Sequence, residues 1–343
     1  MDRTMPAVVL VKKGAIDKAF EVREIPVPVP GDHEVLIQVE AFGLNYADGM
    51  AIKGNYRDAP PLPSVLGYDV CGNIAAVGKL VNSFRVGDRV TAMTRFGGYA
   101  GYAVTDERAV VRIEEDTSLC AALALATQAA TAWYCAEEAC TLYEGERVVI
   151  TAAAGGVGSL LLQMAKRRNV KAYGIVSTEA KEAIVRSLGA DGVLNRSRGD
   201  IFAQYQQQEG RKAIDVMFDS AGGSYIRKGI RNLAPGGRMV GYGGAQGSNA
   251  NHIFSLLSFA LSFGFYHPAS FLLQSQALIG VNMLRLADHK PYVVQRCMQQ
   301  SVRLFNNGEL RPLEGKVFPV EQIADAHRAL QLGTIPGKVA IKW

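Results

Sequence analysis

Hydrophobic residues occur in two different patterns along this chain, and the change from one to the other divides it. Residues 7–11, 34–43, 70–78 and 88–93 are short runs rich in β-branched residues, separated by turn formers such as Gly87–Asp88. Runs of this kind predict β-strands joined by turns. We therefore expect the first third of the chain to form an irregular β-barrel or sandwich rather than a parallel sheet.

After about residue 120 the pattern becomes an alternation of helices and strands. Residues 118–139 have a helical pattern, and helices are also expected at 159–169 and 177–189. Short apolar runs predict buried strands at 146–151, 171–176, 192–195, 213–223, 237–244 and 277–283. Strands that alternate with helices predict a doubly wound parallel sheet, so the fold class is α/β.

The turn between the first of these strands and its helix has the sequence "TAAAGGVGSL", residues 151–160. It contains Ala153-x-Gly155-x-x-Gly158, a dinucleotide-binding spacing with Ala in the first glycine position. Gly155 would let the backbone approach a pyrophosphate, and Gly158 would let the helix pack closely on the strand. Gly156 and Val157 complete the turn, and the helix N-terminus would face the anion. The alternative is a glycine-rich turn without a ligand.

The residues after the next strand favour one nicotinamide cofactor over the other. An NAD site usually offers Asp or Glu to the ribose about 20 residues after the glycine turn, whereas this chain has Ser177 there. Lys181 follows one helical turn later, and Arg196 follows the third strand; a 2′-phosphate would use such cations. We therefore expect NADPH rather than NADH, although Glu179 would blur this preference if it turned inward. Alternatively, Lys181 and Arg196 are solvated surface charges.

Composition limits the other classes of function. The net charge of +5 comes from 37 basic and 32 acidic residues, which do not indicate a nucleic-acid partner. Five cysteines without tight pairs favour reduced thiols and a cytoplasmic protein, and no run is typical of a secretory signal. The apolar stretch 253–265 is too short to span a bilayer. We interpret it as a buried or interface helix, with a membrane-surface patch as the alternative.

Seven motifs, in one order over nearly the whole chain, carry a family resemblance. They are "EVLIQVEAFGLNYADGMAIKGNY", "VLGYDVCGNIAAVG", "VGDRV", "GGYAGYAV", "AAAGGVG", "DVMFDSAGG" and "GKVAIKW". This set resembles the medium-chain dehydrogenase/reductase superfamily, and within it the zinc-independent quinone oxidoreductases. Region 243–283 is more similar to the branch that contains the vesicle amine transport protein homologues.

The resemblance implies a domain organisation. Residues 1–122 and 310–343 would form a GroES-like β-barrel domain that the C-terminal tail completes, and residues 123–309 a Rossmann domain that binds NADPH. It also implies a cleft between the domains where the nicotinamide meets a small substrate. The protein would be a homodimer in which the strand "ALIGVNM" pairs at the sheet edge.

Metal binding is not expected. The zinc-dependent relatives place Cys near position 45 and Gly-His-Glu at 67–69, whereas this chain has Asn45 and Gly67-Tyr68-Asp69. It also lacks the four closely spaced cysteines of their structural zinc lobe. Because zinc needs three or four N or S ligands, we expect no metal site.

Without a metal to polarise an alcohol, hydride transfer to a quinone or another α,β-unsaturated carbonyl is the favoured reaction. The developing oxyanion then needs donors and a proton. In the segment that matches the family's substrate-side loop, Asn45 can donate to the acceptor oxygen or hold the nicotinamide ribose. Tyr46 and Tyr56 are candidate phenol donors or packing residues, and Asp48 can orient Asn45 or cap the loop. Met50 stands where bacterial quinone reductases often have Tyr.

Further cofactor contacts are implied by the resemblance alone. Thr131 would lie near the phosphates or the nicotinamide, although a helical threonine can instead bond its own backbone. Lys338 matches a late residue that reaches over the cofactor, with a surface lysine as the alternative. The remaining implied contacts follow two strands, and they are Gly241, Tyr242, Gly243, Val281 and Asn282.

Two rival functions stay open. The first is reduction of an enoyl thioester, whose phosphorylated carrier would need a basic entrance such as Lys53 and Arg57. The second is an NADPH-binding sensor, or a membrane- or RNA-associated regulator, with little turnover. The apolar stretch 253–265 and the lack of an obvious catalytic acid support this second alternative.

Overall fold

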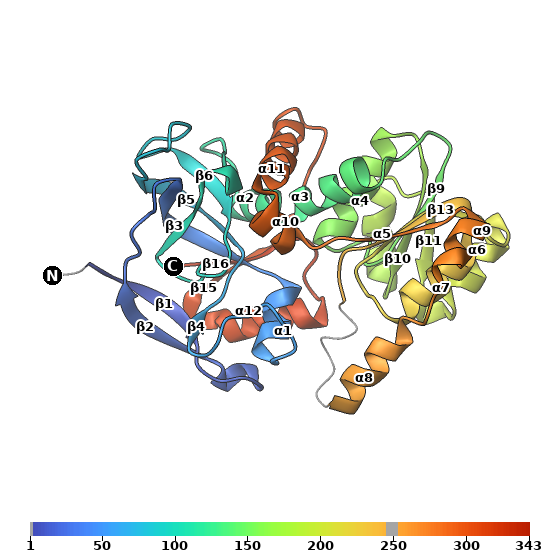
Figure 1. Cartoon of the computed structure of the whole chain (residues 1–343), viewed down its shortest axis with the longest axis horizontal. Helices are drawn as coiled ribbons and strands as arrows, with labels where there is room; N and C mark the ends of the chain where they lie inside the picture. The colour runs from blue at the N-terminus through green and yellow to red at the C-terminus, as the bar shows by residue number, and fades with distance from the viewer. Residues whose placement is uncertain (1–2, 245–252) are drawn as a thin grey trace. The chain divides into compact units, whose positions relative to one another are not determined.

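The computed structural model describes residues 3–244 and 253–343, which divide into two compact units (Figure 1). Unit 1 holds residues up to 130 together with 283–343, and unit 2 holds residues 131–282. The sequence-based boundaries lie at 122/123 and 309/310. The chain returns to unit 1 earlier because α11 (Pro291–Asn306) packs against β8 (Val110–Arg112), with α10 (Met283–His289) beside it.

Unit 1 is built on two β-sheets. The larger has seven strands in the order β15-β16-β3-β5-β6-β8, with β7 paired to β3, and the smaller has the order β2-β1-β4. This confirms the expected β-rich domain. The remaining strand bounds are β1 Thr4–Leu10, β2 Phe20–Pro26, β3 Glu34–Leu44, β4 Ser64–Val65, β5 Asp69–Val77, β6 Arg89–Met93, β7 Tyr102–Asp106, β15 Lys316–Pro319 and β16 Val339–Lys342.

The C-terminal strand closes the larger sheet. β16 runs antiparallel to β3, with Val339 opposite Leu44. Because β5 pairs with the other side of β3 and sets Phe42 opposite Val70, the next positions along the ladder bring Gly43 beside Asp69. The same register brings Lys338 to Asn45. Three segments that are far apart in the sequence thus meet at one end of β3.

The helices of unit 1 pack around this barrel. Residues 119–139 run from α2 through two π-helical segments into unit 2. They are the single described helical stretch long and apolar enough to cross a membrane, yet 67% of its most apolar window is buried, as in a core helix. The bounds are α1 Tyr46–Ile52, α2 Leu119–Ala124, η3 Leu125–Ala129, α3 Ala130–Trp133, η4 Tyr134–Ala139 and α12 Ile323–Leu332. Short 3₁₀ turns lie at Ile16–Lys18, Glu107–Ala109 and Val320–Gln322 in unit 1 and at Arg196–Arg198 in unit 2.

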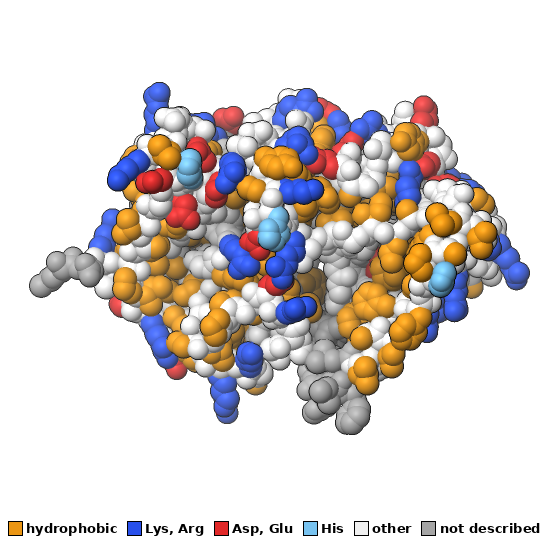
Figure 2. Space-filling view, in the orientation of Figure 1, with side chains coloured by type: hydrophobic (Ala, Val, Ile, Leu, Met, Phe, Trp, Pro, Cys, Tyr) orange, Lys and Arg blue, Asp and Glu red, His pale blue; other side chains and the backbone are white. Residues whose placement is uncertain are grey.

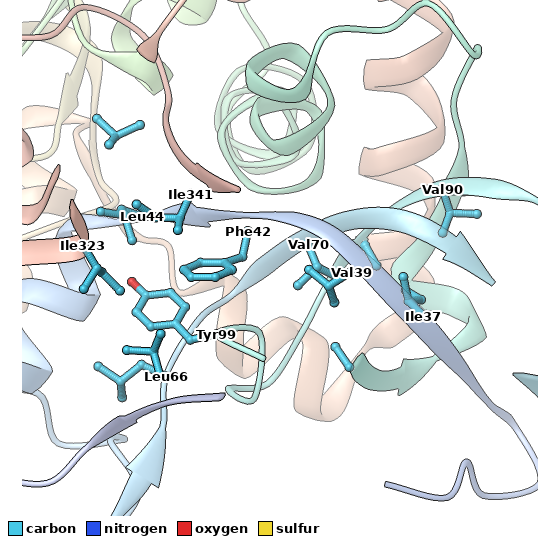
Figure 3. Packing of buried hydrophobic residues seen from close by; sticks show 14 of the residues in the cluster. Ile37, Val39, Phe42, Leu44, Leu66, Val70, Val90, Tyr99, Ile323 and Ile341 are labelled. Carbon is cyan, nitrogen blue, oxygen red and sulfur yellow. The ribbon is translucent and has the colours of Figure 1, made fainter. Parts of the chain in front are cut away.

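The barrel interior is filled by apolar side chains from its strands and from α12 (Figure 3). The rings of Phe42 and Tyr99 stack with their centroids 4.5 Å apart, and Leu66 and Ile323 pack close to them. Since Tyr99 is fully buried, its hydroxyl must find its partners inside the barrel. This interior therefore sets the position of the polar groups described below.

Unit 2 is a six-stranded parallel sheet in the order β11-β10-β9-β12-β13-β14. The order reverses direction beside β9, as in a doubly wound fold, and this confirms the expected architecture. The strand bounds are β9 Arg147–Ile150, β10 Lys171–Val176, β11 Gly192–Asn195, β12 Ile214–Asp219, β13 Leu233–Gly241 and β14 Ala277–Gly280.

Helices cover both faces of this sheet. Successive strand residues point to opposite faces. Tyr173 packs edge-on against Tyr205 of α6, whereas a side chain at Gly174 would run into Val185 of α5. The helices α5 and α6 therefore lie on opposite faces. The bounds are α4 Gly156–Arg167, α5 Glu179–Ser187, α6 Ile201–Glu209, α7 Ser224–Asn232, α8 Ile253–Ser262 and α9 Pro268–Gln274.

Candidate active site

The glycine-rich turn joins β9 to α4 at the carboxyl edge of the parallel sheet. A Cβ on Gly158 would lie 2.9 Å from the Cα of Ala153 and still closer to the Ala152 carbonyl, so only glycine fits there. Gly155 is the N-cap of α4 and brings no capping side chain, which leaves the first N–H groups of the helix facing outward. The turn thus has the shape and the dipole that suit a pyrophosphate.

Neighbouring strands end at the same edge. The Val281 N–H donates to the Gly241 carbonyl at 2.8 Å, and the Tyr242 N–H donates to the Asp219 carbonyl at 2.9 Å. A Cβ on Gly243 would lie 2.7 Å from the Ser220 carbonyl oxygen. The structure therefore brings Gly241, Tyr242, Gly243, Val281 and Asn282 together on adjacent strand ends, at the edge where ligands bind in such sheets.

Asp219 is a residue at this edge that sequence reasoning missed. Its buried carboxylate accepts the N–H groups of Ala221 and Gly222 at 3.1 and 2.7 Å, which shapes the turn after β12. Burial raises its pKa to about 6, against the opposing effect of those hydrogen bonds. Its signal in the sequence is the acid that ends an apolar strand just before "SAGG".

The two cations expected near a ribose lie close enough to affect one another. Burial lowers the pKa of Lys181, and the nearby positive charge of Arg196 lowers it further. Arg196 also faces the hydroxyl of Tyr225. Ser177 directly follows β10 and is half-buried. Glu179 turns outward, with 82% of its side chain exposed and an ion pair to Arg198, so it does not oppose an anion here.

In unit 1, Asn45 stands at the centre of a buried polar cluster. The Lys338 ammonium donates to the Asn45 Oδ1 at 2.9 Å and lies 2.8 Å from the Asp69 carboxylate. The Asn45 Nδ2 donates to the Asp69 Oδ1 at 2.5 Å, and the Thr127 hydroxyl lies 3.3 Å from the ammonium. Lys338 and Asp69 have no exposed surface, which excludes the alternative of a surface lysine.

A glycine makes this cluster possible. A Cβ on Gly43 would overlap the carboxylate of Asp69 and the side chain of Lys338. Sequence reasoning missed Asp69 and Thr127 as partners. The available signal is an acid in "GYDVCG" and the first lysine of "GKVAIKW", each directly before an apolar strand run. Opposite charges in buried strands are expected to pair.

The carboxylate of Asp48 holds the backbone of Asn45 in place. Asn45 is the N-cap of α1, and its backbone N–H donates to the Asp48 Oδ2 at 2.7 Å. Burial, the largest cause, raises the pKa of Asp48 to about 7, although the Asn45 N–H and the Tyr99 hydroxyl act against this rise. The Tyr99 hydroxyl also lies 3.4 Å from the Nε2 of His327, whose pKa burial lowers to about 3.

The remaining expected residues are not among the hydrogen-bond partners described for Asn45. Tyr46 opens α1 with 47% of its surface exposed. Tyr56 is half-buried and packs edge-on against Tyr68, and burial raises the pKa of both phenols. Thr131 is half-buried in α3, at the start of unit 2. In residues 3–244 and 253–343, no three His, Cys, Asp or Glu side chains are grouped so that they could hold a metal ion.

Removal of the buried cation tests the cluster. Lys338→Met leaves the Asp69 carboxylate buried without its partner, so we expect the free energy of unfolding to fall by about 3–5 kcal/mol. The matched control is Lys228→Met, which breaks an exposed lysine–aspartate pair with Asp200 and should cost less than about 1 kcal/mol. Urea denaturation measures both; equal losses would contradict the role assigned to Lys338.

The raised pKa of Asp48 predicts a pH dependence of stability. As pH rises from about 4 to 7, the unfolded chain loses this proton while the folded protein keeps it, so the free energy of unfolding falls through that window. In Asp48→Asn this fall should be smaller by more than about 1 kcal/mol between about pH 5 and about pH 8. Asp17→Asn, at an exposed ion pair, is the control and should leave the fall unchanged. The same pH profile in Asp48→Asn and the wild type would refute the assignment.

Comparison with known proteins gives this arrangement a family. Residues 31–115 match the family described as "Alcohol dehydrogenase GroES-like domain", and residues 188–341 the one described as "Zinc-binding dehydrogenase". Human quinone oxidoreductase is 29% identical over 312 residues, which are 91% of this chain and 89% of the human protein.

Solved structures agree over the whole length. Quinone oxidoreductase from Pseudomonas syringae is 26% identical with a TM-score of 0.84, covering 99% of this chain and 100% of that one. CurK enoyl reductase is 25% identical with a TM-score of 0.84, covering 98% and 99%. The same fold occurs in human synaptic vesicle membrane protein VAT-1 homolog-like protein, 24% identical with a TM-score of 0.84, covering 99% and 98%. It also occurs in Escherichia coli quinone oxidoreductase complexed with NADPH, 22% identical with a TM-score of 0.85, covering 98% and 100%.

The β-rich unit that ends in β16, the doubly wound sheet with its glycine-rich turn, and these matches along the chain agree with one another. The chain belongs to the quinone oxidoreductase family of the medium-chain dehydrogenase/reductase superfamily, with a GroES-like domain and a Rossmann domain.

Proposed function

We propose that this protein is an NADPH-dependent oxidoreductase that reduces quinones or other α,β-unsaturated carbonyl compounds without zinc. The observation that carries the proposal is the buried cluster in which Lys338 and Asp69 fix the amide of Asn45. This amide stands in the segment that matches the family's substrate-side loop. The glycine-rich turn and the cations of unit 2 support NADPH as the cofactor.

The choice of NADPH as the cofactor is based on the charges near the expected ribose site. Two cations that approach one another in a partly buried place repel, and an anion between or beside them relieves that repulsion. Lys181 and Arg196 form such a pair, and Ser177 adds a hydroxyl donor next to them. The exposed position of Glu179 removes the carboxylate that would reject a 2′-phosphate. These contacts favour NADPH over NADH, and the tight turn at Gly158 fits its pyrophosphate.

The substrate half rests on the donors of Asn45. An amide has two N–H donors, and here one of them is used by Asp69 while the Oδ1 accepts from Lys338. These partners fix which end of the amide is nitrogen, and they leave one N–H to donate to an acceptor oxygen or to a ribose hydroxyl. When bound, NADPH supplies the hydride. The donated N–H of Asn45 stabilises charge that develops on the acceptor oxygen, as in an oxyanion hole.

The same contacts support the proposal that the protein works without zinc. In the zinc-dependent relatives a Cys and a Glu stand where this chain has Asn45 and Asp69. The Lys338 ammonium lies within 2.9 Å of side-chain oxygens of both residues, so the positive charge at this place is a covalent part of the chain. A divalent cation at the same oxygens would be repelled by that ammonium.

Two finer features complete the proposal. We expect a homodimer, because β14 is the edge strand of the parallel sheet and has a side open for pairing with a second copy. We expect a cytoplasmic protein, because all five cysteines are buried free thiols. Thr131, Tyr46 and Tyr56 remain predictions as contacts to cofactor or substrate.

Reduction of an enoyl thioester is the second candidate, and the similarity to CurK enoyl reductase favours it. Lys53 is half-buried at the end of α1, and Arg57 is exposed in the loop that follows. Both cations could receive the phosphates of a carrier. Substrate preference, rather than cofactor preference, separates this candidate from the quinone reductase.

The deciding experiment is oxidation of NADPH and NADH by the purified protein with a panel of acceptors. The panel holds ortho- and para-quinones, simple enones and a short enoyl thioester, and a reaction without acceptor is the control. We expect turnover with NADPH on a quinone or an enone. Preference for the thioester would support the second candidate. Tight NADPH binding without turnover on any acceptor would refute the reductase and favour a sensor.

A paired substitution tests the cofactor assignment. Lys181→Ala combined with Arg196→Ala removes both cations, so kcat/KM for NADPH should fall about 10- to 100-fold while the value for NADH changes less than about twofold. Arg211→Ala, at an exposed arginine in the same unit, is the matched control and should change neither value. An equal loss with both cofactors would mean that the two cations do not recognise the 2′-phosphate.

A further inference from the structure

Tyr68, just before β5, has a hydroxyl that is shut away from solvent and left unpaired. The residue directly precedes Asp69, and 8% of its surface is exposed. Its hydroxyl is buried and makes no hydrogen bond of ordinary geometry to any residue that the structure describes. Buried polar groups in native proteins nearly always have a partner, so each exception requires a physical reason. The function assigned so far gives this hydroxyl none.

Tyr68 belongs to a group of three aromatic rings. Its ring centroid lies 6.3 Å from that of Tyr56, in an edge-on arrangement, and 5.1 Å from that of Phe96. Tyr56 is close enough to raise the pKa of the Tyr68 phenol, although it does not satisfy the hydroxyl. Phe96 has a φ of 65°, in the left-handed region that a bulky side chain rarely adopts. Backbone strain of this kind gathers at ligand sites. We call Tyr56, Tyr68 and Phe96 the aromatic group.

The aromatic group adjoins the two carboxylates that hold Asn45. Asp69, the next residue after Tyr68, accepts the side-chain N–H of Asn45, and Asp48 accepts its backbone N–H. After burial, the charge of Asp48 is the largest cause that raises the pKa of Tyr68. The buried hydroxyl and the second side-chain N–H of Asn45 therefore lie in the same part of unit 1.

Two ion pairs with α10 hold the chain segments that carry the other two rings. Asp58 pairs with Arg285, and Arg95 pairs with Asp288. Figure 2 shows charged side chains of both signs gathered over α10. Each pair adjoins one member of the aromatic group in the sequence, and Tyr56, two residues before Asp58, is half-buried. The group therefore reaches from this charged surface to the buried hydroxyl, within unit 1 alone.

We propose that Tyr68 is a catalytic residue whose hydroxyl donates a hydrogen bond to the acceptor oxygen, beside the second N–H of Asn45. The proposal rests on the function proposed above and adds a second donor to its oxyanion site. A carbonyl oxygen has two lone pairs, so it can accept from both donors. The hydrogen bond strengthens as negative charge develops on that oxygen, so it stabilises the transition state more than the bound acceptor.

The surroundings of Tyr68 suit a donor that keeps its own proton. Burial, the charge of Asp48 and the phenol of Tyr56 all raise its pKa above the usual value for tyrosine, which is about 10. Such a phenol stays neutral at physiological pH and does not release its proton to the reduced acceptor. Tyr68 therefore supplies the hydrogen bond, and water supplies the proton.

The test is Tyr68→Phe in the full chain, which removes the hydroxyl and keeps the ring. Tyr205→Phe is the matched control, because the Tyr205 hydroxyl is also buried but donates to the Ala213 carbonyl at 2.9 Å, in unit 2. Steady-state kinetics with NADPH and 1,4-naphthoquinone give kcat and KM. Calorimetry gives the Kd of the same quinone in the presence of NADP⁺, which has no hydride to transfer, so this measurement needs no turnover. Thermal unfolding gives the Tm of each variant.

In Tyr68→Phe we expect kcat to fall at least about tenfold while KM changes less than about threefold, because the lost hydrogen bond is strongest in the transition state. The Kd of the quinone should rise about threefold. The Tm should be unchanged or higher, since an unpaired buried hydroxyl is removed. Tyr205→Phe should lower the Tm and leave kcat, KM and Kd unchanged.

Unchanged kcat and Kd in Tyr68→Phe would overturn the proposal, and so would failure of the wild type to bind the quinone. A loss of Tm as large as that of Tyr205→Phe would also overturn it, because the hydroxyl would then be satisfied within the protein. Binding of the quinone by the wild type without turnover would refute the proposed reductase instead. In that case the Kd of Tyr68→Phe still decides whether the hydroxyl contacts the acceptor.

Discussion

The buried ion pair between Lys338 and Asp69 is the interaction on which the polar interior of unit 1 depends. Neither side chain has exposed surface, and an isolated charge at either position would be costly. The two charges are stable there because Gly43 leaves room for them and because Asn45 and Thr127 share the remaining hydrogen bonds. The pair in turn fixes the amide of Asn45, and Asn45 begins α1. The contact that stabilises the interior therefore involves the same atoms as the proposed substrate site.

This dependence gives Lys338 two tasks that usually fall to different groups. It balances the buried carboxylate of Asp69, and in the proposed function it supplies a fixed positive charge beside the amide of Asn45. An ammonium is smaller in charge than a divalent ion and cannot accept a substrate oxygen as a ligand. Its field favours negative charge nearby, and for this reason the proposed function involves a transient oxyanion rather than the ionisation of an alcohol.

The sequence predicted the architecture well because the architecture follows from periodicity. Strand–helix alternation and the turn at Gly155 and Gly158 required no knowledge of distant contacts. The hydrogen-bond partners of Asn45 were harder to predict. Asp69 and Lys338 meet only through the register of β5, β3 and β16, and the local sequence pattern does not specify that register. Lys338 was left open between surface and cofactor for that reason. The outward turn of Glu179 depends on Arg198, a partner nineteen positions along the chain that spacing does not reveal.

The position of β16 has a consequence for how the chain matures during synthesis. Unit 2 lies between the two parts of unit 1 in the sequence, so the ribosome completes residues 131–282 before it makes the strand that closes the first sheet. Until then residues 41–44 of β3 lack the partner strand β16, and the carboxylate of Asp69 lacks its counter-ion. The second unit can fold as it emerges, whereas the first must wait. The nascent chain therefore carries all strands of the parallel sheet at a stage when the β-rich unit still lacks the strand that closes it.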